Sequence, residues 1–187
     1  MASAQGGLET GQRIKLLRKQ LRRTLQDIAA ATGLSASFLS QVERGVAGVS
    51  LTSVKAIAEA LGVPLSRLLD QPPQADAHTR NGVRPTFAAS KAQQRFERLS
   101  AKFPGSVLEA LKVYLPVGFC SDFVAHDGEE LVYVLAGQVR YHLEDGDYEL
   151  APGDSIHIDS HRRHQLSNTG TVEAVIISVG TLPLFDA

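Results

Sequence analysis

Residues 36–41 combine side chains that can read the base edges of DNA. Gln41 can form two hydrogen bonds with adenine, and a serine hydroxyl can donate to or accept from either type of base. Ser35 is a suitable N-cap, and the helix that it starts presents small and polar residues away from its apolar face. These residues are Ala36, Ser37, Ser40 and Gln41. We expect them to face the major groove, where one good contact gives about 1–3 kcal/mol of discrimination between bases.

Other groups in the same part of the chain are suited to the phosphates of DNA. Arg13, Lys15 and Arg44 are cationic. Ser50 precedes a predicted helix, whose first N–H groups can bind an anion. Such contacts fix the orientation of a protein on DNA without reading its sequence.

Two short helices, over residues 25–31 and 36–43, must position these side chains. Between them, Gly33 can adopt the left-handed conformation that a tight turn requires. The shared core of the two helices is expected to consist of Ile28, Leu34, Leu39 and Val42. Apolar spacing, caps and glycine breaks predict five helices in this half of the chain, over residues 11–22, 25–31, 36–43, 51–61 and 65–69.

The distribution of charge favours the same half as the part that contacts a polyanion. Residues 1–70 carry nine Lys or Arg against five Asp or Glu, whereas residues 71–187 carry ten against fifteen. Many solvated helices are basic, so this excess alone is weak evidence. Combined with the side chains of residues 36–41, it favours DNA as the partner.

Composition and cysteine content point to a cytoplasmic protein. No eighteen consecutive residues are apolar, which argues against a membrane span. Residues 1–7 lack the basic start and apolar run of a secretory signal. Cys120 is the single cysteine, so the chain cannot form an internal disulfide.

The pattern divides the chain into two domains. Residues 1–8 form a polar tail, residues 9–70 the helical domain, and residues 71–84 a proline-containing linker. Residues 85–187 change to an alternating pattern that predicts an antiparallel sandwich or barrel. Its strands are expected over residues 107–115, 131–135, 139–143, 148–150, 155–158 and 172–179, with a tight hairpin at Asp145-Gly146.

The helical domain resembles the XRE, or lambda-repressor-like, helix-turn-helix regulators. The resemblance rests on several segments in the family's order, which are residues 13–18, 28–29, 33–35, 38–45 and 57–63. It implies a five-helix bundle that binds a palindromic double-stranded DNA operator as a homodimer.

The second domain resembles a cupin, a small double-stranded antiparallel β-barrel or jelly roll, over residues 107–179. The first motif runs from His126 through Glu130 to Gly137, and the second contains Gly153-Asp154 and a later His164. Asn168 follows that histidine by four residues.

Residue by residue, the cupin resemblance places His126, Glu130 and His164 on metal-ligand positions, whereas Val124 stands where a further histidine is usual. Two imidazoles and a carboxylate are enough for a divalent metal such as zinc, iron or nickel. The same residues could instead bind an amine or carboxylate effector directly, or form a structural polar cluster. Second-tier candidates for the pocket are Tyr133, Tyr141 and Phe123.

The two domains in this order resemble the XRE-cupin regulators, which are one-component switches. The resemblance implies a transcriptional regulator, not an enzyme, whose operator binding responds to a metal or to a small effector such as an amino acid or polyamine. Two alternatives remain. One is an iron-dependent cupin oxygenase or epoxidase with a vestigial helix-turn-helix, and the other is a regulator whose cupin domain only dimerises.

Overall fold

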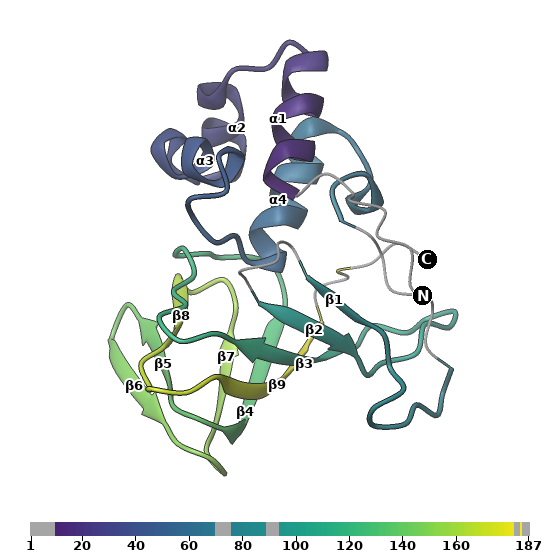
Figure 1. The fold of residues 1–187 in the computed structure, drawn as a ribbon, viewed down its shortest axis with the longest axis vertical. Helices are drawn as coiled ribbons and strands as arrows, with labels where there is room; N and C mark the ends of the chain where they lie inside the picture. The colour runs from purple at the N-terminus through teal and green to yellow at the C-terminus, as the bar shows by residue number, and fades with distance from the viewer. Residues whose placement is uncertain (1–9, 70–75, 89–93, 182–183, 185–187) are drawn as a thin grey trace, which may run out of the picture.

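The computed structural model describes residues 10–69, 76–88, 94–181 and 184. Helices form the N-terminal part and antiparallel strands the C-terminal part, which lies below the helices in Figure 1. None of the helices in these ranges has the length and apolar character that crossing a membrane requires. We refer to the two parts as the helical domain and the β-sheet domain.

Within residues 10–69, four α-helices build the helical domain. They are α1 (Thr10–Gln20), α2 (Leu25–Thr32), α3 (Ala36–Glu43) and α4 (Leu51–Leu61). The predicted count of five was wrong, because the last segment forms only the 3-10 helix η1 (Leu65–Arg67). Pro64 precedes it, and its hydrogen bonds run over three residues, as from the Leu68 N–H to the Leu65 carbonyl.

Caps at both ends explain where α2 and α3 begin and end. Thr24 and Asp27 form a capping box at the start of α2, with each side chain accepting from the other residue's N–H. Gly33 ends α2 with a φ of 73°, in the left-handed region. Ser35 caps α3 by accepting from the Phe38 N–H at 3.1 Å. The turn between the two helices therefore has the geometry that the sequence predicted.

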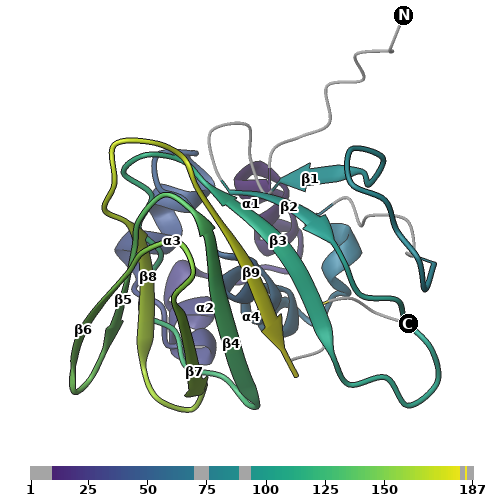
Figure 2. The same cartoon turned by 90° about the horizontal axis from the view of Figure 1, so that it is seen from below.

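The described residues of the β-sheet domain form nine strands. They are β1 (Thr86–Ala88), β2 (Arg95–Arg98), β3 (Glu109–Leu115), β4 (Glu129–Ala136), β5 (Val139–Leu143), β6 (Gly146–Leu150), β7 (Ser155–Asp159), β8 (His164–Asn168) and β9 (Ala174–Gly180). One sheet has the order β1-β2-β3-β9-β4-β7 and the other the order β6-β5-β8, and the pairings are antiparallel. Figure 2 shows the smaller sheet at one side of the larger.

The two sheets share one apolar interior. Val132 and Val134 of β4 and Ile176 of β9 are almost fully buried in the larger sheet. Val139 and Tyr141 of β5 are buried in the smaller sheet. Residues of both sheets line one cavity, which opens the interior toward α4.

Three strands and one turn differ from the sequence prediction. β1 was not predicted because its three residues are too few for a periodic pattern, and β2 and β8 were not predicted because most of their residues are polar. The hairpin exists, but Leu143 pairs with Gly146, so Glu144 and Asp145 form its turn. Gly146 begins β6 with a φ of 151°.

The predicted tail and residues 71–75 of the predicted linker lie outside the described residues. Residues 76–84 of that linker are described and contain neither helix nor strand. The division into domains at 9–70 and 85–187 stays a prediction.

Candidate functional site

Helix α3 presents one face to the core and another outward. Leu39 and Val42 are buried, whereas Ser37 is exposed. The remaining members of the predicted DNA-reading set, Ala36, Ser40 and Gln41, are half-buried. The set therefore lies on one helix and away from its most buried positions.

An ion pair fixes α3 against α1. The Arg18 guanidinium donates from Nε to Glu43 Oε1 at 2.6 Å and from Nη2 to Glu43 Oε2 at 2.9 Å. The exposed fractions of the two side chains are 12% and 5%. The hydrogen bond to Glu43 raises the pKa of Arg18 above its ordinary value. Sequence analysis did not identify this pair, because no local pattern indicates that Glu43 is buried.

The predicted phosphate contacts divide into two groups. On α1, Lys15 is exposed and Arg13 half-buried, and Arg44 is exposed at the end of α3. Ser50 lies elsewhere, because it caps α4 and lines the cavity of the β-sheet domain. In this arrangement the N-terminus of α4 faces the β-sheet domain.

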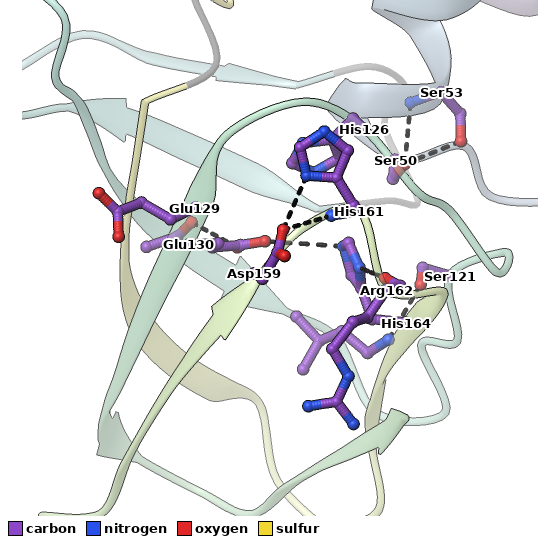
Figure 3. A network of polar contacts seen from close by, with 12 residues as sticks. Ser50, Ser53, Ser121, His126, Glu129, Glu130, Asp159, His161, Arg162 and His164 are labelled. Carbon is purple, nitrogen blue, oxygen red and sulfur yellow. Dashed lines mark hydrogen bonds and ion pairs between the residues drawn. The ribbon is translucent and has the colours of Figure 1, made fainter. Parts of the chain in front are cut away.

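Three predicted site residues come together, two of them, Glu130 and His164, in the wall of that cavity, and the third, His126, in the wall of a neighbouring cleft. Potential ligand atoms of His126, Glu130 and His164 all lie within 4.8 Å of one another (Figure 3). Glu130 lies on β4, His164 starts β8, and His126 lies in the segment before β4. Backbone hydrogen bonds hold these segments together, including one from the His126 N–H to the Ser160 carbonyl at 2.9 Å.

Both imidazoles are oriented by backbone carbonyls. His164 Nδ1 lies 2.8 Å from the Arg162 carbonyl oxygen, and His126 Nδ1 lies 3.0 Å from that of Asp127. A ring nitrogen that bonds a carbonyl carries the proton, which leaves Nε2 as the nitrogen able to bind a ligand. Burial lowers the pKa of His164, although the Arg162 carbonyl and Glu130 oppose this effect. Burial therefore favours the neutral form that a metal ligand requires.

Two hydroxyl groups accompany the Glu130 carboxylate. Ser178 Oγ donates to Glu130 Oε1 at 2.8 Å. Tyr141 is buried and hydrogen-bonded to Glu130, and its pKa is well above the ordinary value because of burial first and Glu130 second. Its hydroxyl therefore stays protonated and is able to donate to that carboxylate. Ser178 could have been found as a polar residue on the inward face of the apolar strand β9.

The donor set is compatible with a divalent metal ion. Two neutral imidazoles and one carboxylate are common ligands of zinc and iron, and the set leaves coordination positions open. Val124, at the position of the missing histidine, forms a backbone bridge with His164. Asn168 of the second motif has a structural role, since its amide donates to the carbonyls of Leu115, Pro116 and Val172.

The second-tier candidates occupy three different places. Tyr141 lines the cavity beside His164. Tyr133 does not, because alternation along β4 turns it to the face opposite Glu130, where it is 42% exposed. Phe123 is 37% exposed and lines a separate cleft between the two domains, with the Arg163 guanidinium 5.5 Å from its ring centre. Tyr133 therefore lies away from the cavity, whereas Phe123 shares its cleft with His126, and the pocket position of Phe123 stays a prediction.

The cavity also contains residues that sequence analysis missed. Its walls include Gln94 from the segment before β2, Ser121, and the first residues of α4. In Figure 3, Ser50 and Ser53, at the start of α4, lie to the right of His126 and His161 and above His164. No local motif marks these residues, because their place depends on how the two domains pack.

Comparison with known proteins identifies both domains. A helix-turn-helix family model matches residues 14–68, and a cupin domain model matches residues 112–180. The chain is 24% identical over 188 residues to the HTH-type transcriptional regulator PuuR of Escherichia coli K12, across 96% of this chain and 98% of that protein.

Two solved structures have the same folds. The structure of a helix-turn-helix family transcriptional regulator from Vibrio cholerae matches with a TM-score of 0.56 and 22% identity, over 93% of this chain and 95% of that one. An RmlC-like cupin from Shewanella frigidimarina matches with a TM-score of 0.51 and 17% identity, over 58% of this chain and 92% of that one. The first of these similarities extends over both domains.

Proposed function

We propose that this chain, an XRE-type helix-turn-helix transcriptional regulator with a cupin domain, changes its affinity for an operator when a metal or small effector occupies the cupin cavity. The supporting observation is that the helical domain forms part of the cavity wall. Ser50, Leu51 and Thr52 of α4 line the same space as Glu130 and His164. An occupant of the cavity therefore contacts both domains. Its affinity then depends on how the two domains are placed, and such a difference in affinity between conformations is what coupling requires.

The DNA contacts are proposed for the outward face of α3. Ser37, Ser40 and Gln41 would read base edges, while Arg13, Lys15 and Arg44 would contact phosphates. A purified homodimer is expected to footprint a short palindrome upstream of its own gene or of a neighbouring gene. Its affinity should fall steeply as salt increases, because phosphate contacts release counterions. Absence of a footprint at every salt and ligand condition would contradict the proposal.

Gln41→Ala should lower affinity for the specific site by about 1–3 kcal/mol, because it removes a two-hydrogen-bond contact to a base. Affinity for unrelated DNA should stay unchanged, since the phosphate contacts remain. Fluorescence anisotropy with the footprinted palindrome and a scrambled duplex measures both quantities. Gln20→Ala, at an exposed position of α1, is the matched control. An equal loss on both duplexes would remove Gln41 from the reading set.

Homodimerisation is proposed through the outer face of the larger sheet. β4 exposes Leu131, Tyr133 and Leu135 on that face, with exposed fractions of 40%, 42% and 45%. Two copies are needed to place recognition helices in successive major grooves, roughly 34 Å apart. Analytical ultracentrifugation should show a dimer for the wild type and a shift toward monomer for Leu131→Glu. A Leu131→Glu protein that remains fully dimeric would place the interface elsewhere.

A metal would be held by His126, Glu130 and His164, with the Arg162 and Asp127 carbonyls orienting the imidazoles. Such an ion would supply a Lewis acid with open coordination positions for an effector. Tyr141 and Ser178 would keep the Glu130 carboxylate in place. The cavity wall then couples this site to α4.

The same three ligands favour one second candidate function, a mononuclear iron oxygenase. Two histidines and one carboxylate are the ligand set of that enzyme class. Oxygen consumption by iron-loaded protein, measured with candidate substrates, tests it. For the regulator we expect no substrate-dependent consumption, and turnover would favour the enzyme.

A further inference from the structure

The cleft that contains Phe123 is larger than the cavity of the β-sheet domain. Its volume is about 310 Å³, against about 90 Å³ for the cavity. Pockets that hold small organic ligands begin at roughly 300 Å³. One wall comes from the helical domain and includes Leu34 and Ala56, and the other comes from the β-sheet domain and includes Phe123 and Ala125. The cleft is therefore large enough for a ligand that contacts both domains.

Arg163 places a cation without a counter-charge in the wall of the cleft. In the described part of the chain, its guanidinium forms no ion pair, and its contact is with the ring of Phe123, 5.5 Å from the ring centre. The neighbouring Arg162, by contrast, pairs with Asp145 at 2.6 Å. A cation over an aromatic ring keeps its N–H donors free, so the guanidinium of Arg163 can bind an acceptor in the cleft.

The other charged side chains of the cleft come from α4 and cancel each other. Lys55 forms an ion pair with Glu59, one turn later on the helix. The Lys55 side chain is 18% exposed and that of Glu59 is 65% exposed, so the cation is the more enclosed of the two. Together with Arg163, this pair gives the described lining a net charge of +1, before His126 is counted. That charge favours a monoanion over a cation or a neutral ligand.

Apolar side chains form much of the remaining wall. Leu34, Ala56, Val124 and Ala125 line the cleft together with the ring of Phe123, which is 37% exposed. Covering this surface is favourable for a ligand with an apolar body, and an aromatic ring covers a large area of it. A bare inorganic ion would leave the apolar surface exposed to water.

We propose that the cleft binds a small organic carboxylate with an apolar body, such as an aromatic acid. The carboxylate accepts two hydrogen bonds from the guanidinium of Arg163, whose planar N–H groups match the two oxygens. Lys55 adds a second positive charge, and the apolar body lies against Phe123 and Leu34. This site is separate from the cavity of the proposed function and requires no metal.

The site brings its ligand to the turn before the proposed recognition helix. Thr32 ends α2, Gly33 and Leu34 lead into α3, and these three residues line the cleft. A bound acid therefore contacts the helix-turn-helix and the β-sheet domain at once.

Calorimetric titration of the intact chain with benzoate, benzamide, benzylamine and acetate tests the ligand class. The protein is first treated with EDTA and dialysed, so that a carboxylate bound to a metal is not measured. Benzamide lacks the charge of benzoate, benzylamine reverses it, and acetate lacks the ring. We expect benzoate to bind more tightly than the other three probes. Binding of benzamide, benzylamine or acetate as tight as that of benzoate, or no binding of benzoate, would overturn the inference.

Arg163→Gln tests the cation. It should lower the affinity for benzoate about tenfold, because it removes a charged partner with two hydrogen bonds. Arg162→Gln is the matched control, since it makes the same change at the next residue, whose side chain pairs with Asp145 and does not line the cleft. An equal loss of affinity in both variants would overturn the role of Arg163.

Ala125→Trp tests the position of the ligand. Ala125 is exposed, so a larger side chain there fills the cleft without disturbing a buried core or changing a charge. The variant should abolish benzoate binding while keeping the circular dichroism of the wild type. Unchanged benzoate affinity in this variant would place the acid outside the cleft and overturn the site.

Discussion

Glu43→Gln should lower the free energy of unfolding of the helical domain by about 3 kcal/mol, because it leaves the Arg18 guanidinium buried without its counter-charge. Arg18 of α1 and Glu43 of α3 are joined by two hydrogen bonds. The variant loses the negative charge of this ion pair, although the amide oxygen of the glutamine can still accept one hydrogen bond. Urea unfolding followed by circular dichroism measures the change.

The exposed pair between Lys55 and Glu59 supplies a matched control. Glu59→Gln makes the same chemical change at a side chain that is 65% exposed. Such pairs contribute only about 0–1 kcal/mol, because solvent screens them. Replacing both members of the buried pair, as in Arg18→Met with Glu43→Leu, should recover much of the stability. Equal destabilisation by the two Glu→Gln changes would contradict the burial argument.

His126→Ala combined with His164→Ala should abolish metal binding. The double change removes both imidazoles and leaves Glu130 as the single remaining ligand. We expect wild-type protein to bind one Zn²⁺ per chain. Loss of even an orienting group usually lowers metal affinity about 10–100-fold, so loss of two ligands should exceed that range. Calorimetry and elemental analysis of the purified proteins measure it.

His157→Ala is the control for nonspecific histidine binding. His157 is exposed on β7 and pairs with Glu129 at 3.0 Å, on the outer face. This variant should bind Zn²⁺ as the wild type does. A wild-type protein that binds no metal would leave direct recognition of an effector as the role of the three residues.

The helical domain was predictable because local interactions set where its helices begin and end. Thr24, Ser35 and Ser50 cap helices through their own side chains, and Gly33 and Gly62 end helices in the left-handed region. These interactions span three or four residues, so the sequence contains them. The prediction of a fifth α-helix was wrong because a short apolar segment shows the same pattern in an α-helix and in one 3-10 turn.

The β-sheet domain was less predictable where polar residues face inward. β8 begins at His164 and ends at Asn168, both buried, so its inward positions do not look apolar. Along β4, Glu130 lies on the inward face. Tyr133 lies an odd number of residues away, so it is on the opposite face. Applying that alternation to the sequence would have excluded Tyr133 from the pocket.

The wall of the cavity was beyond sequence analysis for a different reason. His126, Glu130 and His164 lie in segments that resemble cupin motifs, whereas Gln94 and the α4 N-terminus are brought to the cavity by the packing of one domain on the other. Such contacts have no periodicity or spacing. They become visible only when both domains are placed together.

The double use of α4 constrains any exchange of DNA-binding domains between related regulators. Residues 50–52 belong to the helical domain by sequence and to the cavity by position. If the cavity regulates DNA binding as proposed, a chimaera joined in the segment after η1 would carry a foreign cavity wall next to this β-sheet domain, and it would lose the proposed response while keeping both folds. Restoring Ser50, Leu51 and Thr52 in the donor helix is the smallest graft that would return it.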